Sequence, residues 1–118
     1  MPDLAESIQQ ILKFRDERNW KQFHSVKNLS TAIAIEAAEL QEIFLWRTDE
    51  EIKFKLDGEL EIKKVAAEIA DILIFCLLFC DAVQIDPLQA INDKLSENAK
   101  KYPVELSRSR ADKYTELK

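Results

Sequence analysis

Two pairs of acidic residues have the type and spacing to do chemistry: Glu36 with Glu39, and Glu68 with Asp71. Within each pair the residues are three positions apart, so on an α-helix both carboxylates share one face. The same faces also carry apolar residues, which are Leu29, Ala32, Ile33, Leu40, Ile43 and Trp46 around the first pair and Val65, Ile72, Phe75, Leu78 and Phe79 around the second. Burying a carboxylate is costly unless its charge is matched. Four acids that converge from two helices therefore predict a bound cation.

The donor atoms indicate which cation to expect. Carboxylates without His or Cys suit a hard ion such as Mg²⁺, with Mn²⁺ as a substitute, better than Zn²⁺ or copper. Magnesium usually keeps coordination positions free for water and for substrate phosphates. The sequence therefore predicts a site for phosphate chemistry, in which Mg²⁺ bridges the acids and a phosphorylated ligand.

Helical periodicity defines the elements that must position these acids. We expect four helices, which run from about Asp3 to Arg18, from Asn28 or Ser30 to about Trp46, from just after Gly58 to about Val83, and from Pro87 to near Tyr102. Asn28 and Ser30 are both good N-cap residues, and Asp86 before Pro87 is typical of a helix start. The charged segment 47–58 is predicted to be a loop with a short helical turn at 49–55. The tail, residues 104–118, has no periodic apolar pattern.

Composition favours a single all-α domain that spans residues 1–118 and resembles a four-helix bundle. The chain is 47% hydrophobic and has one Gly and three Pro, too few for the turns of an all-β protein. Its net charge of -5 disfavours a nucleic-acid polymer as partner. Cys76 and Cys80 are interpreted as core thiols in a reducing cytosol. The first residues lack the basic and apolar regions typical of a signal peptide, so we expect none, and the longest uncharged run, residues 72–80, is too short to span a membrane. We therefore expect a cytoplasmic protein with no membrane partner.

The third predicted helix is apolar on more than one face. From Ile69 to Cys80 it is apolar on almost every side, so both of its faces must be covered. One small chain can hardly cover both faces. We therefore expect a homo-oligomer.

With these two acidic motifs, the sequence resembles a known family, the MazG-like all-α NTP pyrophosphatases. The shared signature is E-x-x-E, then 28 intervening residues, then E-x-x-D. The closer resemblance is to the dCTP pyrophosphatase branch, which has a similar Arg/Asn-x-Trp-x-x-Phe-His segment, an Asn-x-x-x-Tyr-Pro run and a Lys-Tyr-Thr-Glu-Leu ending. In this chain these are residues 18–24, 98–103 and 113–117. A single E-x-x-E motif is common on surface helices, but two of them in facing apolar helices are specific.

This resemblance implies hydrolysis of a nucleoside triphosphate to the monophosphate and pyrophosphate. It implies that Glu36, Glu39, Glu68 and Asp71 bind the metal and serve catalysis. It also implies a set of substrate-binding residues, with a base pocket at Trp20, His24 and Trp46 and sugar or phosphate contacts at Lys94, Asn98 and Tyr102. Water is the nucleophile, and no protein nucleophile is needed. The family further suggests a dimer or a tetramer, with pockets shared between chains.

Simpler interpretations of these residues remain. The acidic pairs could be solvated helix faces, Trp20 and Trp46 could be core aromatics, His24 could lie in a surface loop, and Lys94 could be a solvated charge. A di-iron carboxylate protein would need E-x-x-H motifs, and the sequence has none. A non-catalytic helical interaction module is the alternative function. The base preference stays open between dCTP, modified dCTP, dUTP and a broad range of nucleotides.

Overall fold

The computed structural model describes residues 1–117, apart from the side chain of residue 60. Helices make up most of these residues, and no β-strand occurs among them. The predicted all-α fold is therefore confirmed. Lys118, which we included in the expected domain and tail, lies outside the described residues. The chain consists of two compact units, Met1–Gln84 and the residues from Ile85 onward, and each is described by itself.

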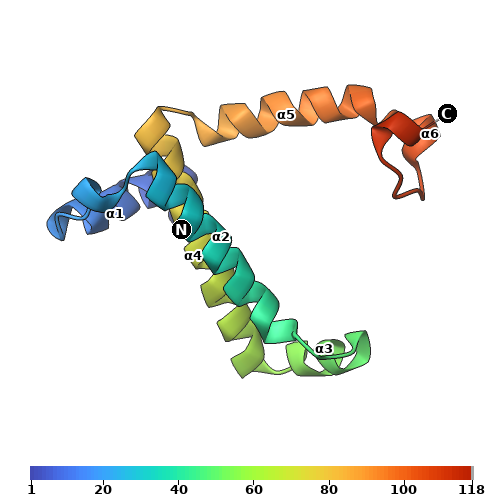
Figure 1. Cartoon of the computed structure of the whole chain (residues 1–118), viewed down its shortest axis with the longest axis horizontal. Helices are drawn as coiled ribbons and strands as arrows, with labels where there is room; N and C mark the ends of the chain where they lie inside the picture. Colours follow the sequence, from blue (N-terminus) through green and yellow to red (C-terminus); the bar gives the residue numbers. More distant parts are fainter. Residues whose placement is uncertain (118) are drawn as a thin grey trace. The chain divides into compact units, whose positions relative to one another are not determined.

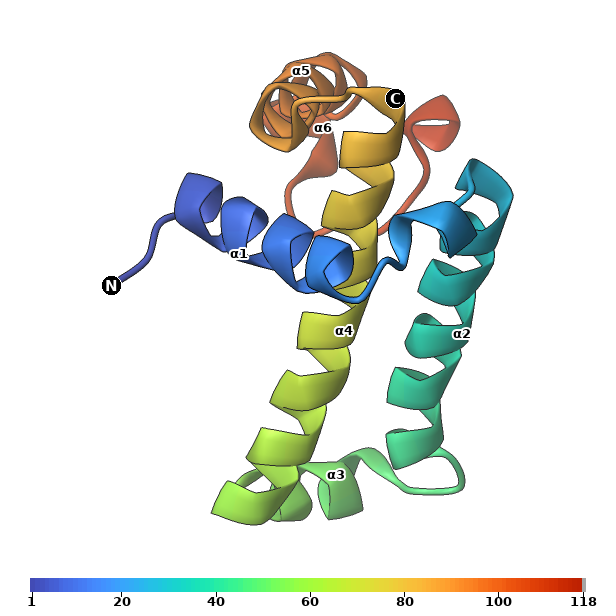
Figure 2. The same ribbon diagram turned by 90° about the vertical axis from the view of Figure 1, so that its left-hand side faces the viewer.

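The first unit is built on two long helices that lie side by side (Figures 1 and 2). These are α2 (Val26–Phe44) and α4 (Glu59–Val83). The short helix α3 (Asp49–Leu56) connects them at one end, and α1 (Leu4–Glu17) crosses α4 nearer the other end. The two acidic motifs are thus carried by neighbouring helices, as the sequence predicted.

The core of this unit lies between α2 and α4. Leu29 of α2 and Leu78 of α4 are the buried apolar residues of the described chain, with 1% and 5% of their surface exposed. Both belong to the apolar stripes that the sequence predicted around the acids, and most other stripe residues are half-buried. The opposite face of α4 carries large apolar residues that this chain leaves exposed, which are Ile62, Ile69 and Leu73.

The start of α2 differs from the prediction. Ser25 is the N-cap, and its Oγ accepts the backbone N–H of Asn28 at 3.1 Å. Asn28 lies inside the first turn, where its side-chain amide donates to the carbonyl of Phe23 at 3.0 Å. The predicted N-caps Asn28 and Ser30 were therefore wrong, because a capping residue one turn earlier satisfies the free N–H groups first.

The end of α2 also differs. The helix stops at Phe44, and Trp46 has a φ of 64°, in the left-handed region. The predicted end of this helix, near Trp46, was therefore wrong, because it lies beyond the observed end. The chain then turns into α3, which is capped by Thr48 and lies where the sequence predicted a short helical turn within a loop. The bounds of α4 agree with those predicted.

In the second unit, α5 (Pro87–Lys101) begins as predicted. Asp86 caps it by accepting the N–H groups of Leu88 and Gln89 at 3.0 and 3.2 Å, and Pro87 occupies the first turn. The tail forms a short helix, α6 (Val104–Ser107), and a 3₁₀ turn at Tyr114–Glu116 that the sequence did not predict. Within the described residues, no helix is both long and apolar enough to cross a membrane.

Candidate metal centre and adjoining cavity

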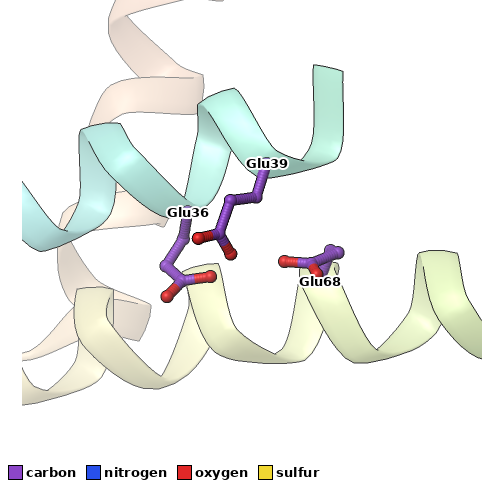
Figure 3. Close-up of side chains that lie close together, drawn as sticks. All are labelled: Glu36, Glu39 and Glu68. Carbon is purple, nitrogen blue, oxygen red and sulfur yellow. The ribbon is translucent and has the colours of Figure 1, made fainter. Parts of the chain in front are cut away.

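Three carboxylates meet between α2 and α4. Glu36 and Glu39 project from α2 toward Glu68 of α4 (Figure 3). One oxygen from each of the three lies within 4.8 Å of the others. The spacing of three residues places both glutamates of α2 on the side that packs against α4. The structure thus brings together three of the four acids that the sequence singled out.

Within residues 1–117, no basic side chain neutralises this cluster. In the described part of the chain, Glu36, Glu39 and Glu68 form no ion pair with Lys or Arg. The Oε2 atoms of Glu36 and Glu68 are buried and have no hydrogen-bond partner within residues 1–117. Unpartnered buried oxygens of this kind are rare in folded proteins. The donor set therefore fits a bound metal ion, and a hard cation suits its oxygen-only chemistry.

Asp71 lies one helical turn after Glu68 on α4. It is not among the three carboxylates that meet within 4.8 Å. Its negative charge nevertheless helps to raise the pKa of both Glu36 and Glu68. Asp71 also lines a neighbouring cavity, so it connects the carboxylate cluster with that cavity.

The carboxylates resist full ionisation. The pKa of Glu36 is raised to about 7, because its carboxyl group lies next to that of Glu39, is removed from water and faces the charges of Glu39, Asp71 and Glu68. The pKa of Glu68 is also raised, first by removal from water and then by the charge of Glu39. Like-charged groups this close hold protons between them until a cation replaces those protons.

This proton binding predicts a pH dependence of stability. Folded Glu36 keeps its proton up to a pKa of about 7, whereas in the unfolded chain the same group ionises near 4.5. Between these values the folded state binds more protons, so the free energy of unfolding of the metal-free protein should fall as pH rises. Calorimetry in the presence of a chelator would measure this fall. The variant Glu36→Gln should show a flatter profile, and identical profiles for the two proteins would contradict the assignment.

A cavity of about 440 Å³ adjoins Asp71 in the first unit. Its lining is mostly apolar and is formed by Gln10, Ile11, Phe14, Arg15, Trp20, His24, Asp71, Ile74, Phe75 and Leu78. The structure thus brings Trp20, His24 and Asp71 of the predicted site to one cavity. A cavity of this size with few polar groups is typical of a small-molecule site.

The aromatic and imidazole groups of this cavity are held by local structure. The Trp20 ring packs edge-on against Phe14, with centroids 5.7 Å apart, and 43% of Trp20 is exposed. His24 follows the 3₁₀ turn Lys21–Phe23, and its Nδ1 is buried without a partner in the described chain. Removal from water and the charge of Arg15 lower the pKa of His24. At neutral pH His24 is therefore uncharged and can offer a hydrogen bond to a bound ligand.

Trp46 is not brought to this cavity. It follows the end of α2 and is 92% exposed, beside a surface hollow that it lines with residues of the last turns of α2. Because α2 ends at Phe44 and Trp46 has a left-handed φ, Trp46 is not part of the helical stripe that carries Glu36 and Glu39. Trp46 therefore lies apart from Trp20 within one chain.

Lys94, Asn98 and Tyr102 belong to the second unit. They are spaced four residues apart and share one side of α5 and its C-cap. The Nζ of Lys94 lies 3.5 Å from a carboxylate oxygen of Glu97, and the Tyr102 ring packs edge-on against Tyr114. These three residues therefore lie along one side of α5 and its C-cap.

Sequence reasoning missed Arg15 altogether. It is the one buried charged residue of the described chain, with 6% of its surface exposed, and it lines the cavity. Its ion-pair partner on α4, Asp81, is 66 positions away, so no short motif could have revealed the pair. The apolar lining residues Ile11 and Phe14 read as ordinary core positions of a helix, since periodicity does not separate a cavity wall from a packed core.

Comparisons with known proteins agree with this architecture. The model of the MazG-like family matches residues 31–117. The protein "dCTP pyrophosphatase 1" of Bos taurus is 37% identical over 98% of this chain and 69% of its own length. Its Homo sapiens counterpart is 34% identical over 98% of this chain and 68% of its own length. A crystal structure of a pyrophosphatase from Archaeoglobus fulgidus has a TM-score of 0.79 and 39% identity, and the match covers 87% of this chain and 94% of that one.

Proposed function

This chain belongs to the MazG-like family and is a nucleoside triphosphate pyrophosphatase, and we propose that its substrate is dCTP or a modified dCTP. The products are the nucleoside monophosphate and pyrophosphate, in a reaction that depends on Mg²⁺. Such an activity removes nucleotides from the cytoplasmic pool. Residues 1–118 would act together as a single MazG-like domain.

The observation that carries this proposal is the position of the carboxylate cluster beside a cavity with an aromatic wall. Glu36, Glu39 and Glu68 offer oxygens to a cation, and the cavity next to them contains Trp20 and His24. Asp71 lies on the same helix as Glu68 and lines the cavity. A nucleotide needs these two environments at once, since its phosphates require a cation and its base requires an apolar surface.

Mg²⁺ is the cation we propose, with Mn²⁺ as a substitute, and Glu36, Glu39, Glu68 and Asp71 are the residues that would hold it. When bound, the ion neutralises the triphosphate and stabilises charge on the pyrophosphate as it leaves. The carboxylates would orient the attacking water, and one of them would accept its proton. Water attacks the α-phosphorus, and the bond between this phosphorus and the oxygen that leaves with pyrophosphate breaks. No group of the protein is modified.

The base would lie in the cavity against Trp20, within reach of His24. Stacking on Trp20 accepts any base, whereas an uncharged His24 can hydrogen-bond to the base edge and discriminate between bases. Trp46, Lys94, Asn98 and Tyr102 are proposed to complete the site at the base, sugar and phosphates. The exposed position of Trp46 supports a contribution from one chain to the pocket of another.

Assembly into a homo-oligomer, a dimer or a tetramer, is part of this proposal. The face of α4 that carries Ile62, Ile69 and Leu73 is left exposed by the described chain, as is the stripe of α5 that carries Leu88, Ile91 and Leu95. Exposed apolar faces of this extent are typical of surfaces that bind a partner. Light scattering should therefore detect a dimer or tetramer, and a stable, active monomer would contradict the proposal.

A shared pocket has a sharper consequence for mixed oligomers. The variant Glu39→Gln keeps Trp46, and the variant Trp46→Ala keeps the acids, so a mixed dimer contains one complete site if the pocket is shared. Assayed at dCTP concentrations well below KM, co-expression of the two should then restore roughly a quarter of the wild-type activity in a two-fold symmetric dimer, because half of the dimers are mixed and half of their sites are complete. Activity no greater than the average of the two separate variants would show that each chain forms its own pocket.

A panel of nucleotides tests the function itself. The protein is incubated with Mg²⁺ and, in parallel, dCTP, 5-methyl-dCTP, dUTP and the other dNTPs, and pyrophosphate release is measured. We expect the highest kcat/KM for dCTP or its modified form and no release after Mg²⁺ is chelated. A non-catalytic interaction module would release no pyrophosphate from any of them.

A further inference from the structure

Arg15 is a buried cation that connects two helices. Its Nη1 donates to Oδ2 of Asp81 on α4 at 2.9 Å, and its Nε donates to Oδ1 of Asp16 at 2.8 Å. The Arg15 side chain is 8% exposed and that of Asp81 is 28% exposed, whereas Asp16 is largely in solvent. A buried guanidinium needs such partners, because an unpaired charge there would be strongly unfavourable. The contact with Asp81 is a polar link between α1 and α4.

The backbone of Arg15 also helps to position Trp20. The carbonyl oxygen of Arg15 accepts the backbone N–H groups of Arg18 and Trp20 at 3.3 and 3.1 Å. These bonds end α1 and turn the chain toward the 3₁₀ turn that leads to His24. Any shift of Arg15 would thus move Trp20 with it.

The Arg15–Asp81 ion pair lies beside the cavity that contains Trp20 and His24. Arg15 and His24 line the cavity of about 440 Å³ and also a second cavity of about 310 Å³, which Asp81 lines as well. The Arg15 guanidinium is therefore close to His24, in agreement with its effect on the imidazole. None of the cluster acids Glu36, Glu39 and Glu68 is hydrogen-bonded to Arg15 in the described chain.

We propose that Arg15 is a positioning residue, which through Asp81 holds the segment of Trp20 and His24 against α4 and so fixes the wall that receives the nucleobase. This inference rests on the proposed function, since it assigns the cavity to the base. The tether acts on base binding and leaves the carboxylate cluster in place. Its loss should raise KM and leave kcat nearly unchanged.

Asp81→Asn is the main test, with Asp16→Asn as its matched control. Each variant removes one carboxylate that accepts a hydrogen bond from Arg15, but only Asp81 belongs to the other helix. We expect Asp81→Asn to raise KM for dCTP by roughly five- to 150-fold, the range that corresponds to the loss of one stacked base. Asp16→Asn should stay within about twofold of wild type, since exposed ion pairs contribute little. Asp81→Glu, which restores the charge, should recover part of the loss.

A readout without substrate separates this inference from the proposed function. In a Trp46→Phe background the only tryptophan left is Trp20, so acrylamide quenching of its fluorescence measures the exposure of the cavity wall. Quenching should increase in Asp81→Asn and stay unchanged in Asp16→Asn. If the protein hydrolyses no nucleotide but quenching responds in this way, the tether stands and the proposed function fails.

Other outcomes would overturn the inference. Equal quenching in the two variants would show that Asp81 does not hold Trp20. A fall in kcat at unchanged KM would place Arg15 in the chemistry of the carboxylate cluster. Where Asp81→Asn fails to fold, as judged by circular dichroism, Arg15→Lys replaces it, because lysine keeps the charge and loses the paired hydrogen bonds of the guanidinium. Wild-type KM and quenching in a folded Arg15→Lys would likewise contradict the tether.

Discussion

Glu39→Gln and Asp71→Asn are each expected to lose turnover by orders of magnitude while the protein stays folded. Each substitution keeps the size of the side chain and removes one negative charge from the proposed metal site. Loss of a charged ligand weakens cation binding and the stabilisation of charge on the leaving pyrophosphate. The fold should persist, because removing one of several like charges that repel one another relieves strain in the metal-free protein. Rates of dCTP hydrolysis and thermal unfolding of the same samples measure both effects.

The control for these variants is Glu59→Gln. Glu59 begins α4, its side chain is 87% exposed, and it lies in the first turn, away from the face of Glu68. This change should leave turnover at the wild-type level. Mg²⁺ should also raise the melting temperature of the wild type and of Glu59→Gln, since a ligand that binds the folded state stabilises it, but much less that of Glu39→Gln. Wild-type turnover in Glu39→Gln or Asp71→Asn would rule out the site assignment.

Trp20→Ala and Trp46→Ala are expected to weaken dCTP binding by about 1 to 3 kcal/mol, the range for stacking of a base on an aromatic ring. Trp20 is 43% exposed and Trp46 is 92% exposed, so neither ring is packed in the core of the described chain. Stability should therefore change little, and the stabilisation by Mg²⁺ should survive in both variants. A core tryptophan would instead cost roughly 3 to 5 kcal/mol of stability on truncation, with or without substrate.

An exposed aromatic that is not assigned to the base controls for the loss of a surface ring. Phe54 of α3 is 81% exposed, and Phe54→Ala should leave the affinity for dCTP unchanged. Affinity and thermal unfolding measured on all three variants separate the interpretations. A fall in stability with unchanged affinity in the tryptophan variants would return both residues to a structural role.

The acids of the cluster could be predicted from sequence because their residue type and their helical spacing both indicate one shared cation site. Glu36 and Glu39 lie on the apolar stripe of one helix, and Glu68 lies on that of another, so burial against each other was the expected arrangement. The bounds of α4 were equally accessible, since Gly58 precedes a helical pattern that no Gly or Pro interrupts before Val83. Periodicity is informative where one long helix covers a whole stripe.

Local competition between similar residues explains what the sequence did not reveal. Ser25, Asn28 and Ser30 can all cap a helix, and only the structure shows that Ser25 does so while Asn28 bonds back to Phe23. The position of Trp46 depends on a left-handed turn after Phe44, which periodicity cannot detect. The Arg15–Asp81 pair joins distant segments, so it follows from the crossing of α1 over α4 and not from any motif.

Phosphorus NMR of dCTP turned over in the presence of Mg²⁺ tests the central claim most directly, because it identifies every phosphorus-containing product at once. The account predicts dCMP and pyrophosphate in equal amounts, at a rate that Glu39→Gln abolishes and Glu59→Gln leaves unchanged. Unreacted dCTP, or dCDP with inorganic phosphate, would contradict it.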